Sequence, residues 1–209
     1  MKLLTYPVGE LSTNCYILVD ETSRDAVAID IGGDEGFLLM EELKNGFNIK
    51  AVLLTHAHFD HIKGTYKFYE RGADVYVSEK DLPAIDNGNL NLSAVFGSEV
   101  KPFKVKTALS GGETLKFGEI EVEVINTPGH TVGGVTYKVG DMLFCGDVLF
   151  EGSFGRVDFP GGDVVTLCRS AKALLEFDGC TLYPGHGNKT TTQKERQSNP
   201  INNYIKYYL

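Results

Sequence analysis

The sequence predicts an α/β fold in which two β-sheets pack face to face and helices cover their outer sides. The first observation is a series of short apolar or alternating runs bounded by turn residues, which is typical of strands. The second is their order, because strands, helices, strands and again helices follow one another along the chain. The third is a content of 24 glycines, which indicates many tight turns. The predicted strands lie at 3–8, 15–20, 25–32, 51–55, 73–78, 115–127, 134–147 and 179–185.

Four segments between these strands have helical character. One helix is expected to begin at Ser78, with the Ser78 hydroxyl as its cap and Asp81 in its first turn. Residues 86–103 are the least regular segment, and we expect them to form a surface excursion near whatever the protein binds. The other helices are predicted over 36–46, which closes at Gly46, over 61–72, which ends at Gly72, and over 164–177.

Composition limits the classes of protein that the chain can represent. The hydrophobic fraction of 42% and the charged fraction of 23% are those of an ordinary globular protein, and no linker divides residues 1–209, so one domain is expected. A net charge of -8 argues against nucleic-acid binding. No segment resembles a membrane span or a signal peptide. The four scattered cysteines are typical of a reducing compartment. We therefore expect a cytoplasmic monomer or small homo-oligomer without nucleic-acid or membrane partners.

A dense group of histidines follows the apolar strand 51–55. Residues 52–64 read VLLTHAHFDHIKG and contain three of the five histidines of the chain, together with an aspartate. By chance, such a pattern would occur on the order of once in several thousand chains of this size. Imidazole and carboxylate groups are the ligands expected for zinc-like ions. The spacing therefore predicts metal ligation by His56, His58, Asp60 and His61.

The other two histidines follow strands in the same way. His130 and His186 each lie in a Pro-Gly-His turn after an apolar strand, and the segment MLFCGDVLF places Asp147 in the same way after an apolar run and a glycine. Together with the first group, these residues make seven candidate ligands. Seven are too many for one tetrahedral ion and are natural for two ions that share a carboxylate. Such a pair of ions can hold a hydroxide at neutral pH, so the ligand set predicts a metal-dependent hydrolase.

The motifs THAHFDH, PGHT, FCGD and PGHG match, in order and spacing, those of the metallo-β-lactamase fold superfamily. The chain resembles this family over essentially its whole length. The resemblance implies a four-layer αββα sandwich with the metals at one edge of the sheets. It also implies that Asp147 bridges two ions, of which one is held by His56, His58 and His130 and the other by Asp60, His61 and His186.

A closer resemblance is to the glyoxalase II branch, the hydroxyacylglutathione hydrolases. The segments 13–18, 149–163 and 185–200 are similar to its short members, which lack the C-terminal helical domain; here 23 residues (209 minus 186) follow His186. The resemblance implies cleavage of an acyl thioester such as S-lactoylglutathione by a metal-bridging hydroxide that Asp60 helps to orient. Two divalent ions, zinc before iron or manganese, are the cofactors it implies.

The loop after Asp147 is the candidate substrate contact, through Arg156, Asp158 and Phe159. Arg156 could bind a carboxylate of the thiol portion, or it could instead form a structural pair with Asp158. The sequence GRVDF also resembles persulfide dioxygenases, which use one iron ion, so an oxidoreductase is an alternative function. A non-catalytic metal-binding or sensor domain is a second alternative, and the complete set of seven candidate ligands argues against it.

Overall fold

The computed structural model describes residues 1–209 and contains two six-stranded sheets. In spatial order, the first sheet consists of β1 (Lys2–Val8), β2 (Thr13–Val19), β3 (Asp25–Ile29), β4 (Asn48–Leu53), β5 (Asp74–Ser78) and β6 (Thr107–Leu109). The second consists of β14 (Thr190–Thr191), β13 (Thr181–Pro184), β10 (Met142–Gly146), β9 (Val135–Val139), β8 (Ile120–Asn126) and β7 (Thr114–Phe117). A small hairpin pairs β11 (Leu149–Phe150) with β12 (Ser153–Phe154).

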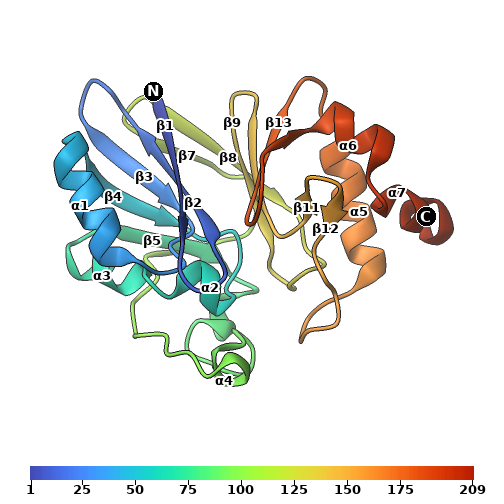
Figure 1. Cartoon of the computed structure of the whole chain (residues 1–209), viewed down its shortest axis with the longest axis horizontal. Helices are drawn as coiled ribbons and strands as arrows, with labels where there is room; N and C mark the ends of the chain where they lie inside the picture. Colours follow the sequence, from blue (N-terminus) through green and yellow to red (C-terminus); the bar gives the residue numbers. More distant parts are fainter.

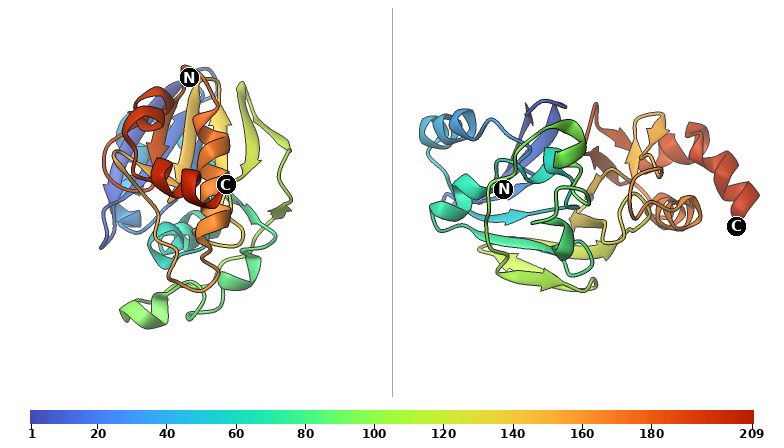
Figure 2. Two further views of the ribbon diagram at one scale, coloured as in Figure 1. Left: turned by 90° about the vertical axis from the view of Figure 1, so that its right-hand side faces the viewer. Right: turned by 90° about the horizontal axis from the view of Figure 1, so that it is seen from below.

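Helices cover the outer sides of both sheets, as Figures 1 and 2 show. On the first sheet lie α1 (Glu35–Asn45) and α3 (Thr65–Glu70). On the second lie α5 (Val164–Leu175), α6 (Thr192–Ser198) and α7 (Ile201–Tyr208). Three short turns of helix lie in connecting segments: α2 (Phe59–Ile62), η1 (Leu82–Ala84) and α4 (Ser93–Phe96). The arrangement is helix, sheet, sheet, helix, which confirms the predicted four-layer α/β fold.

Three apolar cores separate the four layers. Strand β2 is buried along its whole length, and its alternate residues belong to different cores, since Ile17 packs toward α1 while Leu18 packs between the sheets. This alternation follows from the two-residue period of a strand. The third core joins the second sheet to α5, for example through Leu143 and Leu174. Each sheet is thereby held on both faces, which leaves its strand ends to carry the polar side chains.

Two predicted helices differ from those observed. The helix predicted over 61–72 is divided into α2 and α3, because Ile31 takes up backbone groups at the junction: the Gly64 N–H donates to the carbonyl of Ile31, and the carbonyl of His61 accepts from the Ile31 N–H, each at 2.8 Å. The helix predicted from Ser78 does not form, since Ser78 ends β5 and only the short η1 follows. The Asp81 carboxylate is used instead in contacts with other loops. No helix combines the length and the apolar character needed to cross a bilayer.

Candidate metal centre

The four segments that carry the candidate ligands meet at one edge of the sandwich. In the second sheet, β8 and β10 run in the same direction because each is antiparallel to β9, and β13 is parallel to β10. Their carboxyl ends therefore lie side by side and place His130, Asp147 and His186 close together. In the first sheet, the segment after β4 supplies the other candidates from the turn that begins α2.

All seven predicted ligands lie in three overlapping groups of possible metal-binding side chains. Within each group, one nitrogen or oxygen atom per residue lies within 4.8 Å of the others. Because His56 and His61 each belong to two groups, the three form one continuous centre. The groups are His56, His58 and His130; His56, His61 and Asp147; and Asp60, His61 and His186.

Asp147 faces both halves of this centre. Its Oδ1 lies 3.4 Å from Nε2 of His61, and its Oδ2 lies 3.5 Å from Nε2 of His130. On the far side, Asp60 Oδ2 is 3.2 Å from Nε2 of His186. His58 turns its Nδ1 toward the same space, 2.9 Å from Nε2 of His130. Because Oδ2 also lies 3.7 Å from Nε2 of His186, the Asp147 carboxylate faces histidines on both sides of the centre.

Buried polar atoms without hydrogen-bond partners indicate whether the centre fits metal ions. The Nε2 atoms of His56 and His61 and the Oδ1 atom of Asp147 are buried and have no hydrogen-bond partner. Leaving such atoms unpaired is costly, and nearly all buried polar groups in native proteins have a partner. Lone pairs of imidazole and carboxylate that converge on one space are the donors that divalent ions take. The residues present therefore fit divalent metal ions.

In three of the histidines, the Nδ1 atom on the outer side of the ring forms a hydrogen bond, which turns the Nε2 atom toward the centre. Nδ1 of His61 donates to Asp30 Oδ2 at 2.8 Å. Nδ1 of His130 donates to the carbonyl of Arg156 at 2.7 Å, and Nδ1 of His186 donates to the carbonyl of Leu11 at 3.1 Å. Such partners fix the tautomer and the ring orientation of a metal-binding histidine. Each Nε2 then presents its lone pair to the centre.

Asp30 is a functional candidate that the sequence interpretation missed. It is 2% exposed, and besides His61 it accepts hydrogen bonds from the backbone N–H and the hydroxyl of Thr55. The Thr55 hydroxyl in turn accepts from Nδ1 of His56 at 3.1 Å. One carboxylate thus orients two histidines. Asp30 directly follows β3, as Asp147 follows β10, but the strand predicted over 25–32 included Asp30 and so concealed this position.

Burial and the charges of neighbouring side chains together shift the pKa values of the residues in the centre. Burial and the neighbouring histidines lower the pKa of His56, and they lower that of His58 to about 3. Burial opposes a charge on His61, but the surrounding carboxylates outweigh burial and raise its pKa. Burial also opposes the charges of Asp60 and Asp147, yet nearby histidines lower the pKa of both. The lowered pKa values of His56 and His58 favour neutral imidazoles, and those of Asp60 and Asp147 favour ionised carboxylates, which are the states that metal binding needs. A bound ion would displace the proton that the carboxylates favour on His61.

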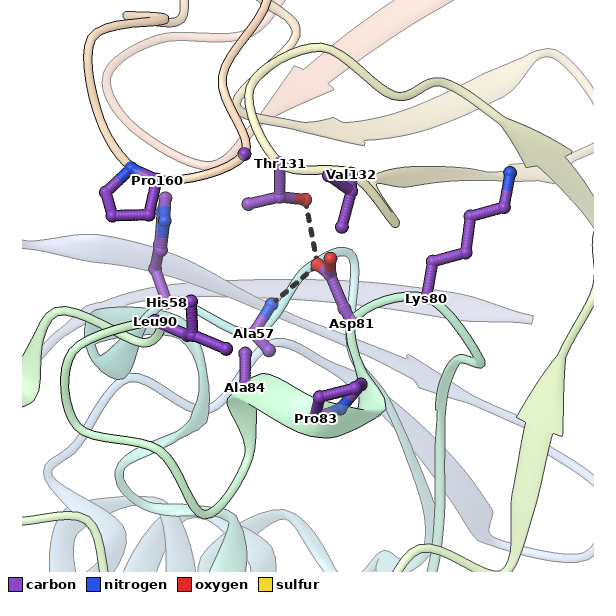
Figure 3. A pocket seen from close by; sticks show the side chains of 11 residues that line it. Ala57, His58, Lys80, Asp81, Pro83, Ala84, Leu90, Thr131, Val132 and Pro160 are labelled. Atoms are coloured by element: carbon purple, nitrogen blue, oxygen red, sulfur yellow. Dashed lines mark hydrogen bonds between the residues drawn. The ribbon is translucent and has the colours of Figure 1, made fainter.

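Asp81 joins the two segments that carry His58 and His130. Its carboxylate accepts hydrogen bonds from the backbone N–H of Ala57 at 3.2 Å, from the hydroxyl of Thr131 at 2.8 Å and from the backbone N–H of Gly133 at 2.8 Å. Figure 3 shows this carboxylate beside a cavity that His58 also lines. The raised pKa of Asp81 is caused by burial, which these hydrogen bonds offset in part.

We expect Asp81→Ala to lower the free energy of unfolding by about 3 kcal/mol, because three buried donors lose their acceptor. Denaturant unfolding of the metal-free protein measures this effect. The matched control is Lys80→Ala, since Lys80 is an exposed neighbour that makes no side-chain hydrogen bond. Equal stability of the two variants would contradict the bridging role of Asp81.

Gly185 allows the β13 strand end to approach the centre. A Cβ atom at this position would lie 2.2 Å from Asp147 Oδ1 and 2.7 Å from Cε1 of His61. Any side chain would therefore displace two candidate ligands at once. Only glycine permits this close approach of backbone to side chain.

The expected result of Gly185→Ala is a loss of stability of about 2 kcal/mol together with at least tenfold weaker metal binding, because the added methyl displaces His61 and Asp147. Metal titration against a chromophoric chelator measures the second effect. The control is Gly36→Ala, where a Cβ atom meets nothing within 4 Å. Unchanged metal affinity in Gly185→Ala would show that the two side chains do not bind metal.

The centre opens into a cavity of about 350 Å³. Of the predicted substrate contacts, Arg156 and Phe159 line this cavity, whereas Asp158 does not. Nε and Nη2 of Arg156 donate to the two carboxylate oxygens of Asp158 at 2.7 and 2.6 Å. The guanidinium also lies over the Phe159 ring, 3.9 Å from its centroid. Of the two expectations for Arg156, the structure shows the pair with Asp158.

One known protein family matches this chain. The family described as "Metallo-beta-lactamase superfamily" matches residues 8–186, which include all seven candidate ligands. The chain belongs to the metallo-beta-lactamase superfamily. The family membership that the sequence motifs indicated is thereby confirmed.

Individual members of the superfamily are similar over nearly the full length of the chain. Hydroxyacylglutathione hydrolase GloC of Haemophilus influenzae is 31% identical, over 97% of this chain and 99% of its own. The crystal structure of BLEG-1 B3 metallo-beta-lactamase matches with a TM-score of 0.90 at 33% identity, over 98% of this chain and 99% of the other. The crystal structure of TTHA1623 in a di-iron-bound form matches with a TM-score of 0.85 at 35% identity, over 95% and 99%. The last protein holds iron, so membership in this superfamily does not specify zinc.

Proposed function

We propose that the protein is a metal-dependent hydrolase of the glyoxalase II-like branch, which cleaves an acyl thioester such as S-lactoylglutathione. The observation that supports this proposal is the continuous centre of seven donors, whose unsatisfied atoms lie at the base of an open cavity. The similarity to GloC, a hydroxyacylglutathione hydrolase, supports the thioester as the substrate class.

In this proposal, two divalent ions occupy the centre. His56, His58 and His130 would hold one ion, Asp60, His61 and His186 would hold the other, and Asp147 would contact both. Divalent ions bound in this way lower the pKa of a coordinated water toward about 7 and polarise a carbonyl group. Zinc is the expected ion, and iron or manganese would satisfy the same donors.

Asp60 is the residue proposed to orient the attacking oxygen. It lines the cavity, and its Oδ2 accepts a hydrogen bond from the Thr13 hydroxyl at 3.1 Å. Because the pKa of Asp60 is lowered, its carboxylate is ionised near neutral pH and can accept a hydrogen bond from the attacking oxygen. At the rim, the Phe159 ring and the guanidinium of Arg156 would contact the substrate, with Asp158 fixing the position of Arg156.

The test is hydrolysis of S-lactoylglutathione by protein loaded separately with zinc, iron or manganese. We expect loss of the thioester absorbance and close to two ions per chain by atomic spectroscopy. Glutathione persulfide under oxygen and a chromogenic β-lactam serve as competing substrates. One iron per chain with oxygen uptake and sulfite formation would instead establish the dioxygenase. Metal binding without turnover of any substrate would favour a sensor.

A further inference from the structure

The walls of the cavity differ in character from its base. Above the centre, the lining is mainly aromatic, with five phenylalanines drawn from four separate segments of the chain. They are Phe59, Phe96, Phe150, Phe154 and Phe159. A concave apolar surface next to a group of convergent polar side chains is the usual form of a small-molecule site.

Phe96 holds this wall together. Its ring centroid lies 5.1 Å from that of Phe59 and 6.4 Å from that of Phe159, so three rings from distant parts of the sequence are contiguous. Phe96 ends α4, within the irregular segment 86–103, and it remains 46% exposed. A ligand group that covered this ring would remove apolar surface from water, which is favourable.

The wall carries a single cation, and that cation is paired. Away from the centre, Arg156 is the one charged side chain that lines the cavity. Its Nε and Nη2 donate to Asp158, and its guanidinium lies over the Phe159 ring. Glutathione carries two carboxylates and an ammonium group. Placing such charges against phenylalanine without partners is unfavourable. The portion of a glutathione thioester that fits this wall is therefore its uncharged acyl group.

We propose that the phenylalanine-lined cavity is an acyl-group subsite, which selects acyl thioesters with a bulky apolar side chain over those with a small one. The inference rests on the proposed thioester hydrolysis. In this arrangement the charged thiol carrier extends toward solvent, and the apolar side chain of the acyl group packs against Phe96 and its neighbours.

A matched pair of substrates tests the selectivity. S-mandeloylglutathione and S-lactoylglutathione share the thiol and the 2-hydroxyl, and they differ only in a phenyl ring against a methyl group. We expect kcat/KM to favour the mandeloyl compound by about tenfold, since the ring buries more apolar surface. In Phe96→Ser this ratio should fall to near one. Val95→Ser should retain it, because Val95 is 65% exposed and does not line the cavity.

Binding of the free acids separates this inference from the proposed function. Titration calorimetry of the metal-loaded protein compares mandelate with lactate, which differ by the same ring. Tighter binding of mandelate that depends on Phe96 would support the subsite even if neither thioester were cleaved. Equal affinities in the wild-type protein would overturn the subsite even if both thioesters were cleaved. If Phe96→Ser unfolds, Phe154→Ser on the β11–β12 hairpin removes a ring from another part of the wall.

Discussion

Asp147→Asn is expected to reduce bound metal from two ions per chain to one or fewer and to lower kcat/KM for the thioester about 1000-fold. The amide has almost the same shape as the carboxylate, so the change removes charge and one oxygen rather than volume. Asp147 Oδ1 and Oδ2 face different histidines, and a single substitution therefore affects both proposed ions. Atomic spectroscopy after gel filtration gives the metal content, and initial rates give the activity.

The matched control for this prediction is Asp141→Asn. Asp141 lies in the exposed turn that precedes β10, the strand that Asp147 follows, so the same change of charge is made outside the centre. We expect this control to keep two ions and full activity. Retention of both ions and of the full rate by Asp147→Asn would remove Asp147 from the proposed centre.

The strands, the metal-site candidates and the family could be predicted because their patterns are local. A histidine directly after an apolar run needs no knowledge of distant residues, and Pro-Gly turns fix where the side chains leave the strands. The break at Gly64 could not be predicted, because its cause is Ile31, which is distant in the sequence. Asp81 was misassigned for a related reason, since its carboxylate binds Thr131 and Gly133 rather than its own helix turn.

The residues that form the cavity wall were harder still to predict from patterns in the sequence. Phe59, Phe96 and Phe159 are each ordinary apolar residues in their own segments, and only the fold makes their rings contiguous. The sequence did indicate that 86–103 lies near a binding site, because an irregular segment between regular elements is typical of functional loops. The two side chains of this segment that line the cavity are Leu92, whose backbone is left-handed with a φ of 68°, and Phe96 at the end of α4.

Asp30→Asn is expected to weaken metal binding by about 10- to 100-fold and to lower the free energy of unfolding by about 2 kcal/mol. Asp30 accepts from Nδ1 of His61 and from the hydroxyl and backbone N–H of Thr55. An amide in its place turns one acceptor into a donor, which then faces another donor. Asparagine is the appropriate replacement because Asp30 has a φ of 54°, a conformation that asparagine tolerates better than alanine.

Asp34→Asn provides the control, since Asp34 has a similar φ of 51° but is exposed, and its carboxylate accepts from the Gly9 N–H and from no histidine. Chelator competition measures metal affinity, and unfolding of the metal-free protein measures stability. If Asp30→Asn lost stability while its metal affinity equalled that of the control, Asp30 would serve only to support the fold. A loss of both is expected, because one carboxylate holds the ring of His61 and, through Thr55, that of His56. The two proposed ions would then depend on a residue that touches neither of them.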